Sequence, residues 1–175
     1  SNPDAFQVKQ CAFPLYEAVE QAHVSWGVHL PKPIAGGHHW HIGDATLIEE
    51  VTALMERDIV PSMSAVTDGA SFAKFLSQMP SGHGWPDFGY ALAALHARDL
   101  DQAHARLTSV KARFDTDPVF HRLRDDSAWG RNAMALLRLI EEDPDAIPAH
   151  CEATARAAVA ANKLEKYWQP EPFWK

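Results

Sequence analysis

The chain has 175 residues, of which 46% are hydrophobic and 22% are charged, and this balance predicts a single folded domain over residues 1–175. Its formal net charge of −7 argues against nucleic-acid binding, because attraction to phosphates requires a basic face. The same acidic balance favours a basic protein partner, since opposite charge speeds the encounter.

The sequence carries few signals of compartment. Cys11 and Cys151 lie far apart and neither belongs to a C-x-x-C motif, so we expect reduced thiols and a cytoplasmic protein. We find no signal peptide and no apolar run of the roughly 20 residues that a membrane span requires. The chain opens with Ser1 rather than methionine, from which we expect that a native N-terminal segment is missing.

The first forty or so residues follow strand patterns. Over residues 22–30, apolar side chains alternate with polar or small ones, which is the period of a half-buried strand. An earlier strand is predicted over residues 6–13 and a short third strand over residues 39–42. Prolines 31 and 33 end the middle strand, because proline cannot donate to a strand ladder.

From Asp44 onward the spacing of apolar residues becomes helical. We expect the first helix to be capped by Asp44 or Thr46 and closed by Pro61. Its single buried stripe is predicted to contain Leu47, Ile48, Val51, Leu54, Met55 and Ile59.

Further helices are predicted from local start and stop signals. The expected positions are after Thr67-Asp68, over residues 88–97, from Leu100, after Asp117-Pro118 with a restart at Asp126-Ser127, and over residues 147–167. The tail at 168–175 contains two tryptophans and is expected to dock on the helices. Strands followed by helices are typical of an α+β fold, so we predict a small N-terminal antiparallel sheet packed against about six helices in the C-terminal three quarters.

Three histidines, His38, His39 and His41, stand in one short stretch. On a strand, His39 and His41 would share a face and could hold one metal ion. No further ligand stands at a usable spacing, so we predict no metal and no cofactor, and interpret the stretch as the joint between sheet and first helix. The His38–His41 cluster leaves one alternative open, a metal-dependent enzyme.

No motif of nucleophilic catalysis is present. Cys151 fits the buried stripe of the last helix, and His150 beside it points about 100° away, so the two side chains do not face each other. There is no G-x-S-x-G motif. We therefore predict no catalytic residues and a protein that is not an enzyme.

Carboxylates gather at the predicted helix junctions, where such groups cap helix N-termini. They would also line one edge of the helical layer with negative charge, which could face a basic partner. Trp85, in a loop rich in proline and glycine, could anchor an interface, and a helical scaffold with a peptide groove near it is a further alternative. The candidate partner-binding residues are Asp115, Asp117, Asp125, Asp126, Glu141, Glu142 and Trp85.

The run from Trp40 to Asp44, the apolar helix after it, the segment Ile59-Val60-Pro61 and the segment at 72–76 together resemble a known family. It is an uncharacterised bacterial family of α+β domains, labelled only a "domain of unknown function", with a similar W-x-I-x-D strand-to-helix joint. The resemblance covers most of the chain and implies no activity and no catalytic residues. Members begin with a helix before the first strand, and its absence here fits a truncated N-terminus.

Small orphan domains of this kind are similar to the immunity proteins encoded beside bacterial toxins. Together with the acidic charge, this similarity favours a non-enzymatic binding protein. The predicted function is an immunity protein that neutralises a basic toxin domain by covering its active site. We expect neither nucleic acid nor membrane among its partners.

Overall fold

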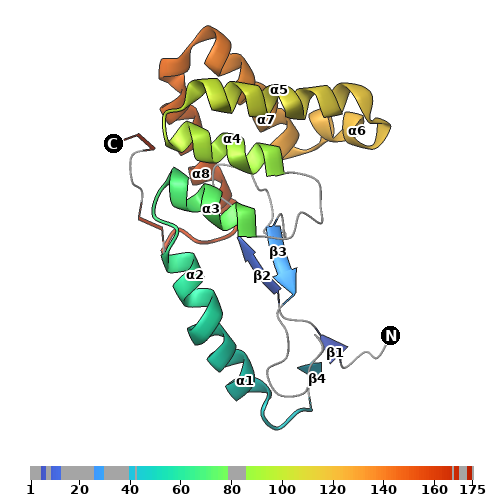
Figure 1. Cartoon of the computed structure of the whole chain (residues 1–175), viewed down its shortest axis with the longest axis vertical. Coiled ribbons are helices and arrows are strands. Elements are labelled where there is room, and N and C mark those ends of the chain that lie inside the picture. Colours follow the sequence, from blue (N-terminus) through green and yellow to red (C-terminus); the bar gives the residue numbers. More distant parts are fainter. Residues whose placement is uncertain are drawn as a thin grey trace.

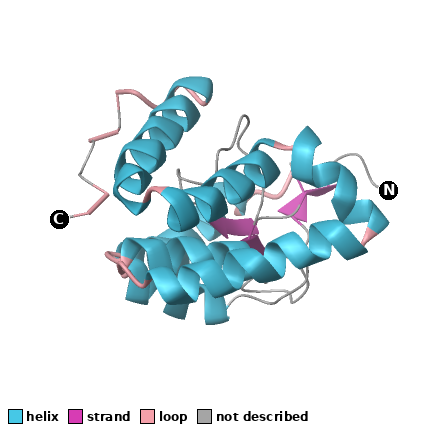
Figure 2. Cartoon of the chain, turned by 90° about the horizontal axis from the view of Figure 1, so that it is seen from above, coloured by secondary structure: helices cyan, strands magenta, loops and turns pink. Residues whose placement is uncertain are grey.

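The computed structural model describes residues 5–6, 9–12, 26–29, 40–41, 43–78, 86–166, 168–169 and 173–174. Helices make up most of this described part, and strands form only short pieces of it (Figure 2). The helical elements are α1 (Leu47–Leu54), the π turn η2 (Met55–Ile59), α2 (Val60–Ser64), α3 (Gly69–Gln78), α4 (Pro86–His96), α5 (Leu100–Thr116), α6 (Pro118–Asp126), α7 (Ala128–Glu142), the 3-10 turn η3 (Pro144–Ala146) and α8 (Ile147–Ala161).

The strands form two separate antiparallel pairs. β1 (Ala5–Phe6) pairs with β4 (Trp40–His41), and β2 (Lys9–Ala12) pairs with β3 (Trp26–His29). Each pair has only two strands, and within the described residues no third strand joins either of them. The pairs lie apart from each other in Figure 1.

The predicted α+β fold is therefore wrong, and the described chain is mainly helical. The predicted strand ranges do contain β2, β3 and β4, but ladders of two and four residues do not make a sheet. A two-stranded ribbon offers too little apolar surface for helices to cover, so it cannot serve as a structural layer. The helices instead bury their apolar faces against one another.

The predicted starts of the helices after residue 97 are confirmed, because their capping groups act locally, whereas α8 ends at Ala161 and not at residue 167 as predicted. Arg98 adopts a φ of 60°, and Asp99 then accepts a hydrogen bond from the Gln102 N–H at 3.0 Å to begin α5. Asp117 accepts from the Val119 N–H at 2.9 Å to begin α6. The Ser127 hydroxyl accepts from the N–H of Gly130 at 3.0 Å to begin α7.

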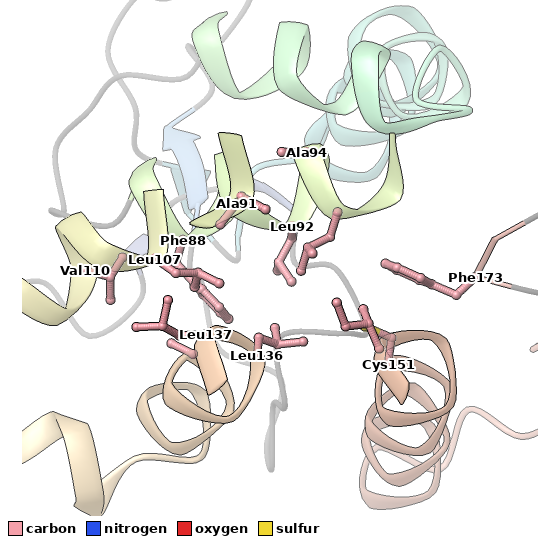
Figure 3. Close-up of a cluster of buried hydrophobic side chains, with 14 of the residues drawn as sticks. Phe88, Ala91, Leu92, Ala94, Leu107, Val110, Leu136, Leu137, Cys151 and Phe173 are labelled. Atoms are coloured by element: carbon pink, nitrogen blue, oxygen red, sulfur yellow. The ribbon is translucent and has the colours of Figure 1, made fainter. Parts of the chain in front are cut away.

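The main core lies among α4, α5, α7 and α8 (Figure 3). Phe88, Leu107, Leu136 and Cys151 are buried there. Trp129 closes one side of the core, with its ring 5.2 Å from that of Phe114. We call the helices α3–α8 the helical body.

The C-terminal tail docks on this body, as predicted, at the residues that the structure describes. Phe173 is buried against the core, and the indole N–H of Trp174 donates to the Leu95 carbonyl at 2.7 Å. Arg98 stacks over the Trp174 ring at 5.4 Å, and Arg156 over the Trp168 ring at the same distance. The tail therefore completes the core instead of exposing its aromatic side chains.

Residues 47–64 form a second helical unit, which we call the arm. It comprises α1, η2 and α2, and it extends away from α4–α8 (Figure 1). Beneath it lies a small separate cluster in which Trp40 and Leu54 are fully buried and Leu47, Val51 and Ile59 are partly buried.

The prediction for the first helix was wrong in three details. The first detail concerns Pro61, which does not end the helix. The π turn η2 precedes it, with the Val60 N–H donating to the Met55 carbonyl five residues back. This wider turn precedes Pro61 at the beginning of α2, where a missing N–H costs little.

The second correction concerns the cap. Thr46 is the N-cap residue, yet its side chain makes no cap hydrogen bond and donates instead to Glu50 at 2.8 Å. Asp44 serves the preceding turn, where its carboxylate accepts from the His41 N–H at 3.2 Å. Neither side chain therefore caps the helix in the expected way.

Candidate interaction surface

Of the predicted histidine cluster, the structure describes only His41, which is exposed on β4. His38 and His39 lie outside the described residues. Within the described residues, no three histidine, cysteine, aspartate or glutamate side chains are grouped so that they could hold a metal ion. The metal-enzyme alternative therefore finds no ligand set in this part of the chain.

The two chemically reactive side chains of α8 serve packing. Burial, with a smaller contribution from Glu152, raises the pKa of the Cys151 thiol to about 12, so the nucleophilic thiolate is not formed at neutral pH. Nε2 of His150 lies 2.6 Å from Oδ1 of the buried Asn132, and this contact joins α8 to α7. Burial, together with the nearby charge of Arg138, lowers the pKa of His150.

The predicted carboxylates are mostly engaged within the body. Lys111 donates to Asp115 at 2.6 Å, and this bond lowers the pKa of the Asp115 carboxyl. Arg124 lies 3.6 Å from Asp115 and 3.0 Å from Asp125, so it bridges the two. Its hydrogen bonds lower the pKa of Asp125. Asp117 caps α6, as described above.

The remaining predicted carboxylates stand elsewhere. Glu141 lies 3.1 Å from Nε2 of His104, which is eleven residues before Asp115 on α5 and therefore roughly 16 Å from it along the helix axis. Asp126 ends α6 and Glu142 ends α7, and both are exposed. The structure thus brings Asp115 and Asp125 together but not the whole set, and Trp85 lies outside the described residues.

One acidic region, in and beside the arm, was missed by the sequence reasoning. Residues 43–68 contain six carboxylates and a single cation, Arg57. The Arg57 guanidinium donates to both carboxylate oxygens of Asp58, at 2.8 and 2.6 Å, so it is already paired on the arm. A count of charge by segment would have found this region.

The arm also exposes apolar side chains, and this is the third correction to the first helix. Ile48 and Met55, expected in the buried stripe, are 81% and 46% exposed, because they lie about 100° around the helix from the partly buried Leu47 and the buried Leu54. Val60 is 52% exposed and Met63 37%. Of the five large apolar side chains exposed within the described residues, only Val119 of α6 lies outside the arm.

Two polar side chains, those of Glu50 and Trp40, are buried in or beside the arm. Glu50 is only 8% exposed, and its second carboxylate oxygen has no hydrogen-bond partner among the described residues. The indole N–H of Trp40 is buried there and likewise without a partner in that part of the chain.

No helix within the described part of the chain is both long and apolar enough to cross a membrane. Comparison of the chain with models of known protein families, with curated proteins and with solved structures finds no match in any of the three, so the family resemblance stays a prediction.

Proposed function

We propose that this protein is a non-enzymatic, cytoplasmic binding protein, and specifically an immunity protein that neutralises a cognate bacterial toxin. It acts by occlusion, with its acidic surface covering the basic active-site cleft of a toxin such as a nuclease. The family resemblance and the formal net charge of −7 both support this function.

The observation that carries the proposal is the uneven distribution of charge. Residues 69–175 contain 13 lysines and arginines against 14 carboxylates, whereas residues 43–68, the arm and its flanks, hold six carboxylates against one arginine. A concentrated acidic region attracts a basic cleft and speeds association by about 10- to 1000-fold, an effect that salt suppresses.

Two described side chains suited to covalent or acid–base chemistry, those of Cys151 and His150, are engaged in packing. The Cys151 thiol is buried with a raised pKa, and His150 is held by Asn132 between two helices. Both contribute to packing in the body, and neither lies on the acidic arm.

Co-expression with the products of the reading frames that adjoin its gene tests the function. We expect one of these products to stop growth when expressed alone, and growth to return when this protein is co-expressed and copurifies with it. A matched pair of variants sharpens the test: Glu49→Lys with Glu56→Lys on the arm should abolish protection, whereas Asp101→Lys with Glu165→Lys, at exposed positions on α5 and beyond α8, should not. If no adjoining product is toxic, or if protection is absent, the proposal fails.

A further inference from the structure

The exposed apolar side chains of the arm follow one face of it, and we call this line of side chains the stripe. Ile48 and Met55 are seven residues apart and therefore lie on the same face, two turns from each other. The π turn then carries the stripe onward, because the Val60 N–H bonds to the Met55 carbonyl and Val60 stands one wide turn beyond it. Met63, three residues later, extends the stripe to a length of roughly 20 Å.

Carboxylates border this stripe on one side. Glu49 follows Ile48 and Glu56 follows Met55, so the two exposed glutamates repeat the same seven-residue spacing on the adjoining face. The single cation of the arm, Arg57, is paired with Asp58. The arm thus presents an apolar line with a negatively charged edge.

From this arrangement we infer that the arm is a docking surface for a basic protein partner, which meets the stripe with an apolar groove bordered by lysine or arginine side chains. The inference deepens the proposed function by naming the surface that would engage the toxin. An amphipathic helix that inserts spaced apolar side chains into a groove is a recurrent mode of protein recognition. Exposed apolar patches rimmed by polar groups are typical of such sites.

The charge of the arm favours a basic protein partner over a second copy of the chain and over an anionic lipid surface. A second copy of the chain would bring Glu49 and Glu56 against another acidic arm, and like charges facing each other oppose association. An anionic lipid surface would repel the same carboxylates, since membrane-binding helices carry lysine and arginine on their polar face. A basic partner satisfies both the apolar stripe and its charged edge.

A synthetic probe tests the inference without knowledge of the natural partner. The probe is a labelled amphipathic peptide of leucine and lysine, of about 20 residues, and its control replaces every lysine with glutamate. We expect fluorescence anisotropy to report binding of the lysine peptide alone, with an affinity that falls at high salt. Ile48→Ser with Met55→Ser should raise the dissociation constant about tenfold or more. The control Val119→Ser, which replaces a side chain that is 72% exposed on α6, should leave the dissociation constant unchanged.

Glu49→Gln with Glu56→Gln should weaken binding at low salt and flatten the salt dependence, and Asp101→Gln with Glu165→Gln is the matched control on exposed positions outside the arm. These side chains are exposed, so circular dichroism should show an unchanged fold. The inference is overturned by equal binding of the glutamate peptide, by an equal loss with Val119→Ser, by dimerisation that Ile48→Ser abolishes, or by binding to zwitterionic lipid vesicles.

The two proposals fail separately. Cells that stay protected by the Ile48→Ser, Met55→Ser variant would remove the arm as the docking surface and leave the immunity function standing. Selective peptide binding on the arm with no toxic neighbour would remove the immunity function and leave the surface standing.

Discussion

The helical body and the arm use apolar residues in opposite ways. In the body, Phe88, Leu107 and Leu136 are removed from water by neighbouring helices. In the arm, Leu54 alone is fully buried, while Ile48 and Met55 remain in contact with solvent. The apolar side chains of the body therefore contribute to folding by burial, whereas several of those on the arm stay exposed, which is the feature that our proposed docking surface requires.

The largest expected effect is on the free energy of unfolding, and it tests whether the body is packed more tightly than the arm. Phe114→Ala should lower the free energy of unfolding by about 3–5 kcal/mol, because it leaves a cavity beside Trp129 in the main core. Met55→Ala, in the arm, should change it by about 0.5 kcal/mol or less. Urea denaturation of the two variants measures the contrast, and equal losses would show that the arm is packed as tightly as the body.

A smaller effect is expected where two body helices cross. A methyl group at Gly69 would collide with the Ala93 carbonyl, so Gly69→Ala should cost about 1–3 kcal/mol by forcing α3 away from α4. At Gly43, before the arm, an added methyl group meets nothing within 4 Å, so Gly43→Ala should be neutral or stabilise by about 0.4–1 kcal/mol. Thermal unfolding compares the two, and a stabilising Gly69→Ala would contradict the close crossing.

The body helix α6 has a side-chain cap, whereas α1 of the arm has none, and the loss of such a cap should have a smaller effect. Asp117→Ala should cost about 1 kcal/mol, because it removes the carboxylate that accepts from the Val119 N–H at the start of α6. Asp126→Ala, at the exposed end of the same helix, is the control and should cost little. If the two variants unfold at the same denaturant concentration, the cap contributes nothing to stability.

The smallest expected effect is on the pH dependence of stability, and it comes from His150 in the body. The folded-state pKa of His150 lies below its ordinary value of 6.5, mainly through burial, so the unfolded chain binds the proton more readily. Stability from the neutral ring is therefore complete above pH 6.5 and is lost as pH falls from 6.5 through the folded-state pKa. His150→Gln should flatten the dependence of the thermal midpoint on pH in that range. A profile unchanged by His150→Gln would refute this role.

Several features were predictable because they depend on a few neighbouring residues. The boundaries at Asp99, Asp117 and Ser127 were predictable because each side chain caps the helix that follows it. The docking of the tail was expected from its tryptophans alone, and Trp174 does bond to the body. No pattern in the sequence indicated which helices it would reach.

Other features were not predictable, and each of them involves distant partners. The alternation at 22–30 predicted a strand, yet β3 finds one partner strand instead of a sheet. The pairing of Asp115 and Asp125 with Arg124 changed them from open charges into members of an ion-pair network. The exposure of Ile48 depended on what lay opposite each face of its helix.

The sequence by itself determined where most of the body helices begin, since capping and proline geometry act within one turn. Only the tertiary structure decided that these helices form the core without a sheet, because sheet formation needs several strands to meet. It also decided that Ile48, Met55, Val60 and Met63 stay exposed beside Glu49 and Glu56. Burial depends on the elements packed against a face, and helical periodicity alone does not specify them.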